Sequence, residues 1–316
     1  MAGLGQMGHG MAKNIRQKIS SDSTVVVYDI NHAALEQFVN DFSSHGPIIA
    51  AGSPKEVAEL ADIVMTSVPA ARHVKDVFLN PQTGLLAAQR QPPNKKILFM
   101  ELSTIDAAAS TKVAEAVMEN DLGDFVDAPC SGGAMGAEAG TLSFMIGCPI
   151  RLYPQVLKIC KLIGKESSIF RCGDLGAGLK TKVLNNYLSA LTALATAETI
   201  NIGIRGGLDP KKLNEIINAS SGQNFNSSVN NPVPGLTPAN PASHGYRGGF
   251  SIELCLGVLE LAVKAAEDLG AKTVLAKPML EAYTEASRDE RFKGKDSKVI
   301  YQYLARPNGE PIPEAQ

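Results

Sequence analysis

The feature that most limits how this chain can fold is a change of pattern at Gly173. Before it, apolar runs at 25–28, 63–65, 97–100, 125–127, 142–146 and 168–171 alternate with helical stretches at 7–19, 54–60, 73–79, 107–119 and 153–163. The runs lack a polar–apolar alternation, which is typical of strands buried on both faces of a parallel sheet. This order predicts a doubly wound α/β domain over residues 1–173.

Beyond Gly173 the strand pattern stops and only helical patterns follow. The longest covers 179–205 and ends at two consecutive glycines, which commonly terminate a helix. Further helices are predicted at 210–219, 252–269 and 278–288, and the proline- and glycine-rich stretch 230–249 is predicted to be a loop. We therefore expect an all-α domain over 174–304 and a disordered tail over 305–316.

Composition excludes several other classes of protein. A length of 316 residues exceeds what one hydrophobic core usually supports, in agreement with two domains, and a net charge of −2 gives no basic surface for nucleic acid. The five cysteines include no C-x-x-C pair, which argues against a disulfide framework and a structural zinc site. The apolar stretch 183–204 contains several polar residues, so we expect a buried helix and no membrane span.

A glycine motif precedes the first predicted helix. Residues 3–8, Gly-Leu-Gly-Gln-Met-Gly, fit G-x-G-x-x-G, in which glycines permit a tight turn and the helix N-terminus offers N–H groups to a pyrophosphate. Asp29 follows the run 25–28, where a carboxylate that binds a ribose 2′-hydroxyl and repels a 2′-phosphate is expected. The pattern predicts NAD as cofactor in a Rossmann-type fold. An ordinary glycine turn and a capping aspartate are the alternatives.

The start of the chain departs from this pattern. Only Met1 and Ala2 precede Gly3, although the fold needs a central strand of about five residues there. We interpret this as a truncated first strand: either the chain begins late, or the sheet lacks its middle strand.

The predicted helix 179–205 carries a polar stripe. Its members Lys182, Asn185, Asn186 and Ser189 are spaced at i, i+3, i+4 and i+7 and therefore share one face. Burying such groups without partners is costly, so the stripe is expected to face a polar surface such as a substrate pocket at the domain boundary. The alternative is a capping lysine beside asparagines that satisfy loop carbonyls.

Ser131, Gly132 and Gly133 follow the predicted strand 125–127. Consecutive glycines after a serine expose N–H groups and a hydroxyl, an arrangement that suits a carboxylate, although a plain glycine-rich turn explains them equally well. No histidine lies near Cys130 in the sequence, which disfavours Cys130 as a nucleophile.

Together these segments resemble the β-hydroxyacid dehydrogenase family, and its hydroxyisobutyrate branch in particular, from Gly3 to about Leu304. The matching pieces are GLGQMGHGMAKN (3–14), VPAARHV (68–74), STID (103–106), DAPCSGG (127–133), AGTLSFMIG (139–147), GAGLKTKVLNN (176–186), NPVPG (231–235) and YRGGF (246–250). DAPCSGG and the K-x-x-N-N of 182–186 are specific to the family.

The resemblance implies a role for each matching residue. Lys182 would be the catalytic lysine and Asn186 would hydrogen-bond the substrate, whose carboxylate would lie on Ser131, Gly132 and Gly133. The NAD site would be lined by Gly3, Leu4, Gly5, Gln6, Met7, Gly8, Asp29, Val68, Pro69, His73 and Thr104.

Three positions depart from the branch. It usually carries a Lys-Asp pair in the helix after GGF, with the lysine reaching cofactor and substrate, whereas Gly257 and Val258 stand there in this chain. In KDSK (295–298) Ser297 replaces a typical aromatic residue, and Cys130 replaces a valine. The first departure bears on substrate choice and on NAD affinity.

The resemblance implies an oxidoreductase that transfers a hydride from 3-hydroxyisobutyrate to NAD and forms methylmalonate semialdehyde in valine catabolism, with Lys182 as general acid and base. A related 3-hydroxy acid dehydrogenase or semialdehyde reductase and a non-catalytic NAD-binding homologue are the alternatives. We also expect a homo-oligomer, a dimer or tetramer, because the apolar helices of the second half exceed what one half-domain can bury. The family suggests a mitochondrial location, with the cytoplasm as the alternative.

Overall fold

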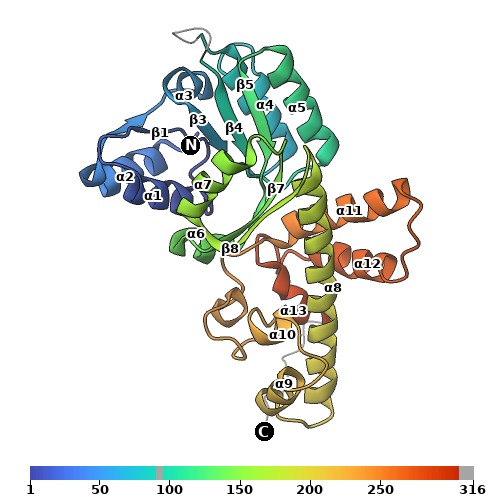
Figure 1. The fold of residues 1–316 in the computed structure, drawn as a ribbon. Helices are drawn as coiled ribbons and strands as arrows, with labels where there is room; N and C mark the ends of the chain where they lie inside the picture. The colour runs from blue at the N-terminus through green and yellow to red at the C-terminus, as the bar shows by residue number, and fades with distance from the viewer. Residues whose placement is uncertain (90–94, 306–316) are drawn as a thin grey trace. The chain divides into compact units, whose positions relative to one another are not determined.

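The computed structural model describes residues 1–89 and 95–305 and divides into two compact units, the first Met1–Lys182 and the second from Val183 onward (Figure 1). Apart from its first residue, Ala305, the predicted disordered tail 305–316 lies outside the described residues. The first unit ends at Lys182, whereas the domain boundary was predicted after residue 173, and that boundary stays a prediction.

The first unit contains two pieces of β-sheet. In the smaller piece β1 (Val25–Val27) pairs in parallel with β2 (Ile48–Ala50). In the larger, β3 (Ile63–Thr66), β4 (Ile97–Glu101) and β5 (Gly123–Asp127) are parallel neighbours. The far edge is mixed, since β7 (Leu142–Gly147) runs antiparallel to β5 and β6 (Cys130–Ser131) and parallel to β8 (Gly164–Gly173). The Rossmann-type prediction is confirmed, with this mixed edge in place of a wholly parallel sheet.

Ala2 connects the two pieces of sheet at the place of a central strand. It forms parallel bridges to Tyr28 on one side and to Thr66 on the other. The Ala2 N–H donates to the Met65 carbonyl at 2.8 Å, and the Ser67 N–H donates to the Ala2 carbonyl at 3.0 Å. Ala2 thus joins the end of β1 to the end of β3, directly before the glycine motif.

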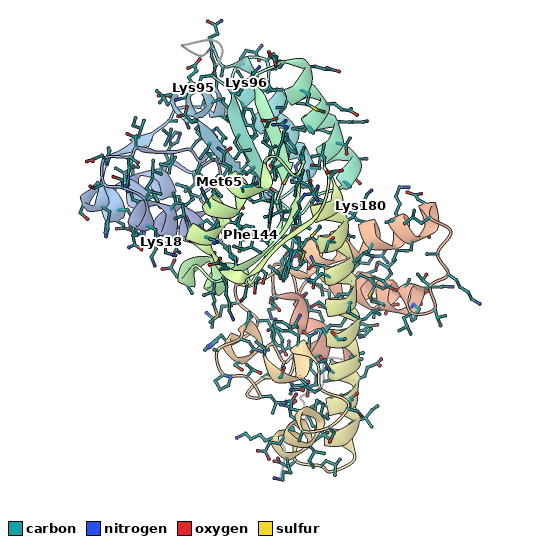
Figure 2. All side chains as sticks on the ribbon, viewed as in Figure 1. Lys18, Met65, Lys95, Lys96, Phe144 and Lys180 are labelled. Atoms are coloured by element: carbon teal, nitrogen blue, oxygen red, sulfur yellow. The ribbon has the colours of Figure 1, made fainter. Side chains whose placement is uncertain are left out.

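Helices cover both faces of this sheet, because successive strand residues point to opposite sides. Val25 and Val27 pack on one face with α1 (Gly8–Lys18), α2 (His32–Phe42), α6 (Gly133–Ala139) and α7 (Tyr153–Ile163). Val26 packs on the other face with α3 (Pro54–Leu60), α4 (Ala71–Leu79) and α5 (Ala107–Glu119). Met65 and Phe144, labelled in Figure 2, are buried in the core of the first face, whereas Lys95 is exposed and paired with Asp62.

The second unit is helical. The long helix α8 (Ala177–Arg205) runs into it from the first unit, followed by α9 (Pro210–Asn218), α10 (Phe225–Ser228), α11 (Ile252–Asp268), α12 (Ala276–Arg288) and α13 (Ile300–Ala305). Small residues of α8, including Ala190 and Ala197, pack in one core with Leu259 of α11 and Tyr283 of α12. Within the described ranges, none of the helices is long and apolar enough to cross a membrane.

Candidate active site

The glycine motif forms a tight turn between Ala2 and α1. A Cβ on Gly3 would lie 2.2 Å from the Ser67 carbonyl oxygen, and one on Gly8 would lie 1.9 Å from the Gly3 carbonyl oxygen. A Cβ on Gly5 would meet no atom within 4 Å. Two of the glycines are therefore required by the fold of the loop, whereas the third faces open space and is free to serve a ligand.

Three consecutive backbone N–H groups, those of Gly5, Gln6 and Met7, have no acceptor among the described residues. They precede α1, an 11-residue helix whose N-cap has no side-chain hydrogen bond and whose first turn has no acidic residue. Such a helix N-terminus attracts an anion through its unpaired N–H groups and its dipole. These residues fit the pyrophosphate of a dinucleotide.

Asp29 contacts this turn from the end of β1. One carboxylate oxygen accepts the Leu4 N–H at 2.6 Å and the other accepts the Asn31 N–H at 2.8 Å. Each carboxylate oxygen has a further lone pair, so Asp29 can fix the loop and also accept from a ribose hydroxyl.

The other predicted cofactor residues follow β3 and β4, at the same edge of the sheet. The Val68 N–H donates to the Ser103 hydroxyl at 2.8 Å, which brings Val68 and Pro69 beside Thr104. His73 lies in the first turn of α4, and its Nδ1 is buried without a hydrogen-bond partner among the described residues. An unpartnered buried nitrogen at this edge suits a polar ligand group.

Glu101, which the sequence did not single out, organises this edge. It is fully buried at the end of β4, where its carboxyl accepts from the Thr66 hydroxyl and from the Ser103 N–H at 2.7 Å. Burial raises the pKa of the Glu101 carboxyl to about 7. Because Ser103 in turn binds Val68, Glu101 connects the loops after β3 and β4.

Lys182 lies in the second turn of α8, and its side chain is only 7% exposed. No carboxylate or hydrogen-bond acceptor among the described residues contacts its ammonium. Burial lowers the pKa of Lys182, and its charge opposes the burial that raises the pKa of the Cys130 thiol to about 11. The Lys182 ammonium is therefore within electrostatic reach of the Cys130 thiol, whereas Lys180, two residues earlier, is exposed (Figure 2).

Cys130 leads directly into the predicted carboxylate cradle. Ser131 ends β6, and Gly132 and Gly133 both have positive φ angles, of 133° and 63°. A Cβ on Gly132 would press on Leu142, whereas one on Gly133 would meet no atom within 4 Å. The turn thus leaves open space beside the backbone of Gly133.

Asp127 anchors the helix that carries Lys182. This buried residue ends β5, and its carboxylate accepts the Gly176 N–H at 2.7 Å and the Leu179 N–H at 2.8 Å, with a further backbone hydrogen bond from Gly178. A Cβ on Gly178 would lie 2.8 Å from this carboxylate. Asp127 is the first residue of the motif DAPCSGG, from which the sequence analysis used only the serine and the glycines. Gly176 and Gly178, on either side of Ala177, were a signal in the sequence that a side chain packs closely there.

The remaining polar residues of the α8 stripe belong to the second unit. Asn186, one turn beyond Lys182, and Ser189 are half-buried, whereas Asn185 is exposed. The Asn186 amide has no hydrogen-bond partner among the described residues.

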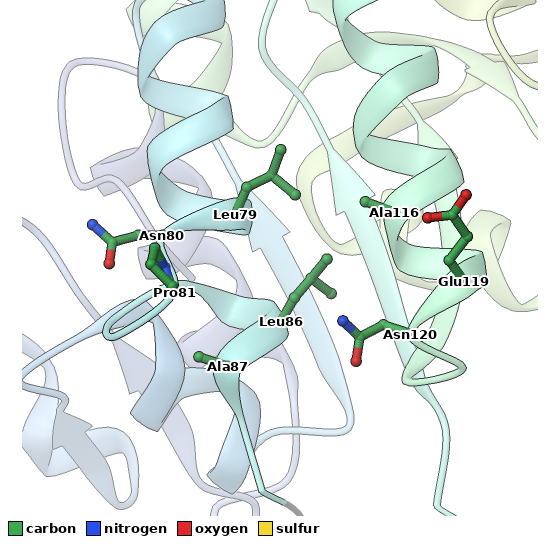
Figure 3. Close-up of a pocket in the computed structure, with 8 residues that line it drawn as sticks. All are labelled: Leu79, Asn80, Pro81, Leu86, Ala87, Ala116, Glu119 and Asn120. Atoms are coloured by element: carbon green, nitrogen blue, oxygen red, sulfur yellow. The ribbon is translucent and has the colours of Figure 1, made fainter.

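A surface pocket in the first unit contains none of the predicted site residues (Figure 3). It lies between the C-terminal ends of α4 and α5 and is lined by Leu79, Asn80, Pro81, Leu86, Ala87, Ala116, Glu119 and Asn120. Since α4 leads into β4, this pocket lies at the amino ends of the strands, away from the glycine motif. Ligands of open α/β sheets bind at the carboxyl ends, so we assign this pocket no part in the site.

Two protein families match the chain in succession. The NAD binding domain of 6-phosphogluconate dehydrogenase matches residues 1–173. The family described as "NAD-binding of NADP-dependent 3-hydroxyisobutyrate dehydrogenase" matches residues 176–304.

Full-length relatives agree with these matches. The chain is 36% identical over 304 residues to a probable mitochondrial 3-hydroxyisobutyrate dehydrogenase of Dictyostelium discoideum, covering 96% of this chain and 89% of that protein. It is also 36% identical to the 3-hydroxyisobutyrate dehydrogenase of Pseudomonas aeruginosa, covering 94% and 95%. A structure of the Mycobacterium tuberculosis 3-hydroxyisobutyrate dehydrogenase with L-serine superposes with a TM-score of 0.78 and 29% identity, over 96% of this chain and 97% of that one.

Proposed function

This chain belongs to the 3-hydroxyisobutyrate dehydrogenase family, and on that premise we propose that it transfers a hydride from 3-hydroxyisobutyrate to NAD and forms methylmalonate semialdehyde, a step of valine catabolism. The family matches identify an oxidoreductase with an NAD-binding domain. The observation that carries the proposal is Lys182, a buried ammonium without an ion-pair partner among the described residues, within electrostatic reach of Cys130, which precedes the turn at 131–133.

Lys182 is proposed as the group that moves the proton. NAD, when bound, accepts the hydride of the carbinol carbon. The hydroxyl proton passes to the neutral Lys182 amine as the C–O bond becomes a carbonyl, and Lys182 returns it in the reverse direction. Because burial lowers the Lys182 pKa, more of the amine is in the accepting form near neutral pH. Oxidation should therefore slow as the pH falls below that lowered pKa.

The substrate is held by other residues of the chain in this proposal. Ser131, Gly132 and Gly133 would bind its carboxylate through N–H groups and a hydroxyl, and Asn186 would bind its hydroxyl oxygen through the amide. Asp29 favours NAD over NADP, because a carboxylate accepts from a 2′-hydroxyl and repels a 2′-phosphate.

Replacing Lys182 tests the proposal. We expect Lys182→Ala to lower kcat by roughly 10²–10⁴, the usual contribution of positioned proton transfer. The dissociation constant for NADH, measured by fluorescence titration, should stay within about twofold, since Lys182 does not enter the pyrophosphate turn. Lys180→Ala is the matched control, because Lys180 lies on the same helix but is exposed, and its activity should equal the wild type. A Lys182→Ala enzyme that retains most of its turnover contradicts the assignment.

A related 3-hydroxy acid is the second candidate substrate. The observation in its favour is Gly257, where a Cβ would meet no atom within 4 Å, at the position where the branch has a lysine. NADH formation from 3-hydroxyisobutyrate, L-serine and glycerate, and NADH consumption with succinic semialdehyde, would rank the candidates by kcat/KM. The same assay with NADP in place of NAD tests the coenzyme preference.

We also propose that the enzyme is a homo-oligomer, a dimer or tetramer. Along α8, Leu184, Leu188 and Ile202 lie in one stripe and are 60%, 62% and 69% exposed. A stripe of this kind on a helix is typical of a surface that another subunit covers. The names of several relatives support a mitochondrial location, with the cytoplasm as the alternative.

A further inference from the structure

Helix α6 begins at Gly133, at the end of the predicted carboxylate turn. It has only seven residues, Gly133 and Gly136 among them, and no side chain caps its first turn. So short a helix with two glycines has little stability of its own and depends on the elements packed against it. The placement of the turn at 131–133 therefore depends on what holds α6.

The helix that holds α6 is α1, which begins at the glycine motif (Figure 1). The two backbones meet directly, because a Cβ on Gly10 would lie 2.7 Å from the Glu138 nitrogen. Two side chains of α1 reach polar atoms of α6 in the described structure: Lys13, which forms a surface ion pair with Glu138, and Asn14. A surface ion pair contributes little to stability, so Asn14 is the stronger connection.

Asn14 is only 5% exposed, and its side-chain amide donates to three carbonyl groups. One is the Gly10 carbonyl of its own helix at 2.9 Å, and the others are the Ala137 and Glu138 carbonyls of α6 at 2.9 and 3.1 Å. The last two belong to the final turn of α6, where carbonyls lack their usual helical partners. Gly140 leaves room for the amide, because a Cβ there would lie 2.5 Å from the Asn14 Oδ1.

One buried amide thus joins two helices that each begin at a turn assigned to a ligand. The unpaired N–H groups of residues 5–7 lead into α1, and the turn at 131–133 leads into α6. Both turns belong to the first unit. A ligand that fixes α1 also restricts α6 as long as the hydrogen bonds of Asn14 are intact, and restricting one site in this way favours binding at the other.

Resting on the proposed function, we propose that Asn14 is a positioning residue that couples the coenzyme turn at 3–8 to the carboxylate turn at 131–133. Its amide holds α6 in one place on α1, so that coenzyme bound at α1 orders the carboxylate turn and strengthens the binding of the hydroxy acid. By linkage, the hydroxy acid strengthens coenzyme binding by the same factor. In this role Asn14 contacts neither ligand and transfers no proton.

Hydrogen exchange of the full-length protein, followed by mass spectrometry, tests the coupling without turnover. In the wild type, NADH should slow the exchange of the α6 amides at least about threefold. In Asn14→Ser this slowing should disappear, because a serine hydroxyl reaches the carbonyl four residues earlier in its own helix but not α6. Exchange at the start of α1 should be slowed by NADH in both proteins, which shows that the coenzyme still binds.

Two fluorescence titrations give the second readout. Asn14→Ser should weaken the dissociation constant of 3-hydroxyisobutyrate for the enzyme–NADH complex about fivefold or more, the lower end of an ordinary coupling. The dissociation constant of NADH for the free enzyme should stay within about twofold, and a general loss of stability would not separate the two constants in this way. Asn120→Ser is the matched control, because it makes the same change at the exposed end of α5 and should behave as wild type.

Asn14→Asp has the shape of asparagine but no donor, so it should reproduce Asn14→Ser and replaces that variant if the serine protein does not fold. Equal slowing of α6 exchange by NADH in wild type and variant, or no slowing in the wild type, would overturn the coupling. An unchanged dissociation constant for 3-hydroxyisobutyrate would overturn it as well. Failure of the wild type to bind 3-hydroxyisobutyrate contradicts the proposed substrate instead, and the exchange measurement then decides the role of Asn14.

Discussion

Two helices begin in the first unit with backbone N–H groups that have no partner within the helix, and these groups are satisfied differently in α1 and in α8. At α8 the carboxylate of Asp127 accepts the N–H groups of Gly176 and Leu179. At α1 the carboxylate of Asp29 reaches only the Leu4 N–H, and the next three N–H groups remain without an acceptor in the described structure. One helix N-terminus is closed by the protein itself, and the other is left open.

The N-terminus of α8 is suited to hold the helix in place, whereas the N-terminus of α1 is suited to bind a ligand. A helix whose first turn is fixed by a buried carboxylate can hold a side chain such as Lys182 in one place relative to β5 and the turn that follows it. A helix whose first turn is open can accept an anion from outside the protein. If this interpretation is right, changes at α8 should affect turnover and stability together, whereas changes at α1 should affect the cofactor alone.

The largest effect is expected for Asp127→Ala, which leaves the N–H groups of Gly176, Gly178 and Leu179 buried without an acceptor. At about 1–3 kcal/mol for each of these three unsatisfied groups, the free energy of unfolding should fall by at least about 3 kcal/mol, measured by urea denaturation. In the same variant kcat should fall about a hundredfold or more, because Lys182 loses its fixed position.

Asp124→Ala is the control, since Asp124 lies on the same strand but forms a surface ion pair with Arg151. Its stability should change by less than about 1 kcal/mol. If Asp127→Ala does not fold, Asp127→Asn retains one acceptor oxygen and should remain folded with reduced kcat. Wild-type turnover in both Asp127 variants would show that α8 needs no such anchor.

A smaller effect is expected for Gly5→Ala, which places a methyl group in the open space before α1. The methyl should block the approach of the pyrophosphate and weaken NADH binding roughly tenfold or more, while the melting temperature stays unchanged. Gly8→Ala is the matched variant, because its Cβ would collide with the Gly3 carbonyl and destabilise the loop itself. Equal NADH affinity in Gly5→Ala and wild type would mean that this turn does not bind the cofactor.

The smallest effect is expected for Asp29→Asn, which keeps an acceptor for the Leu4 N–H and removes the negative charge. The ratio of kcat/KM for NAD to that for NADP should fall about tenfold, since repulsion of the 2′-phosphate is lost. Asp41→Asn, on an exposed position of α2, is the control and should leave the ratio unchanged. An unchanged ratio in Asp29→Asn would restrict Asp29 to fixing the loop.

Local patterns in the sequence predicted most of the elements that form the candidate site. The helix predicted at 153–163 has the same bounds as α7, and the one predicted at 179–205 starts two residues after the beginning of α8. Several elements were not predicted from the sequence, among them α2, β2 and α6, and α6 shows why. Its sequence Gly-Ala-Met-Gly-Ala-Glu-Ala contains two glycines, so its helical preference is weak and its packing against α1 stabilises it instead.

The sequence by itself determined the fold class, the glycine motif and the spacing of Lys182 and Asn186 on one helix, because these depend on residues a few positions apart. Only the tertiary structure decided which carboxylate closes which helix and which lysines are buried without a partner. Asp127 meets Leu179 across 52 positions and Leu4 meets Asp29 across 25, and no periodicity encodes such contacts. The physical reason is that the state of a buried charge depends on everything packed around it, and that environment forms only when distant segments come together.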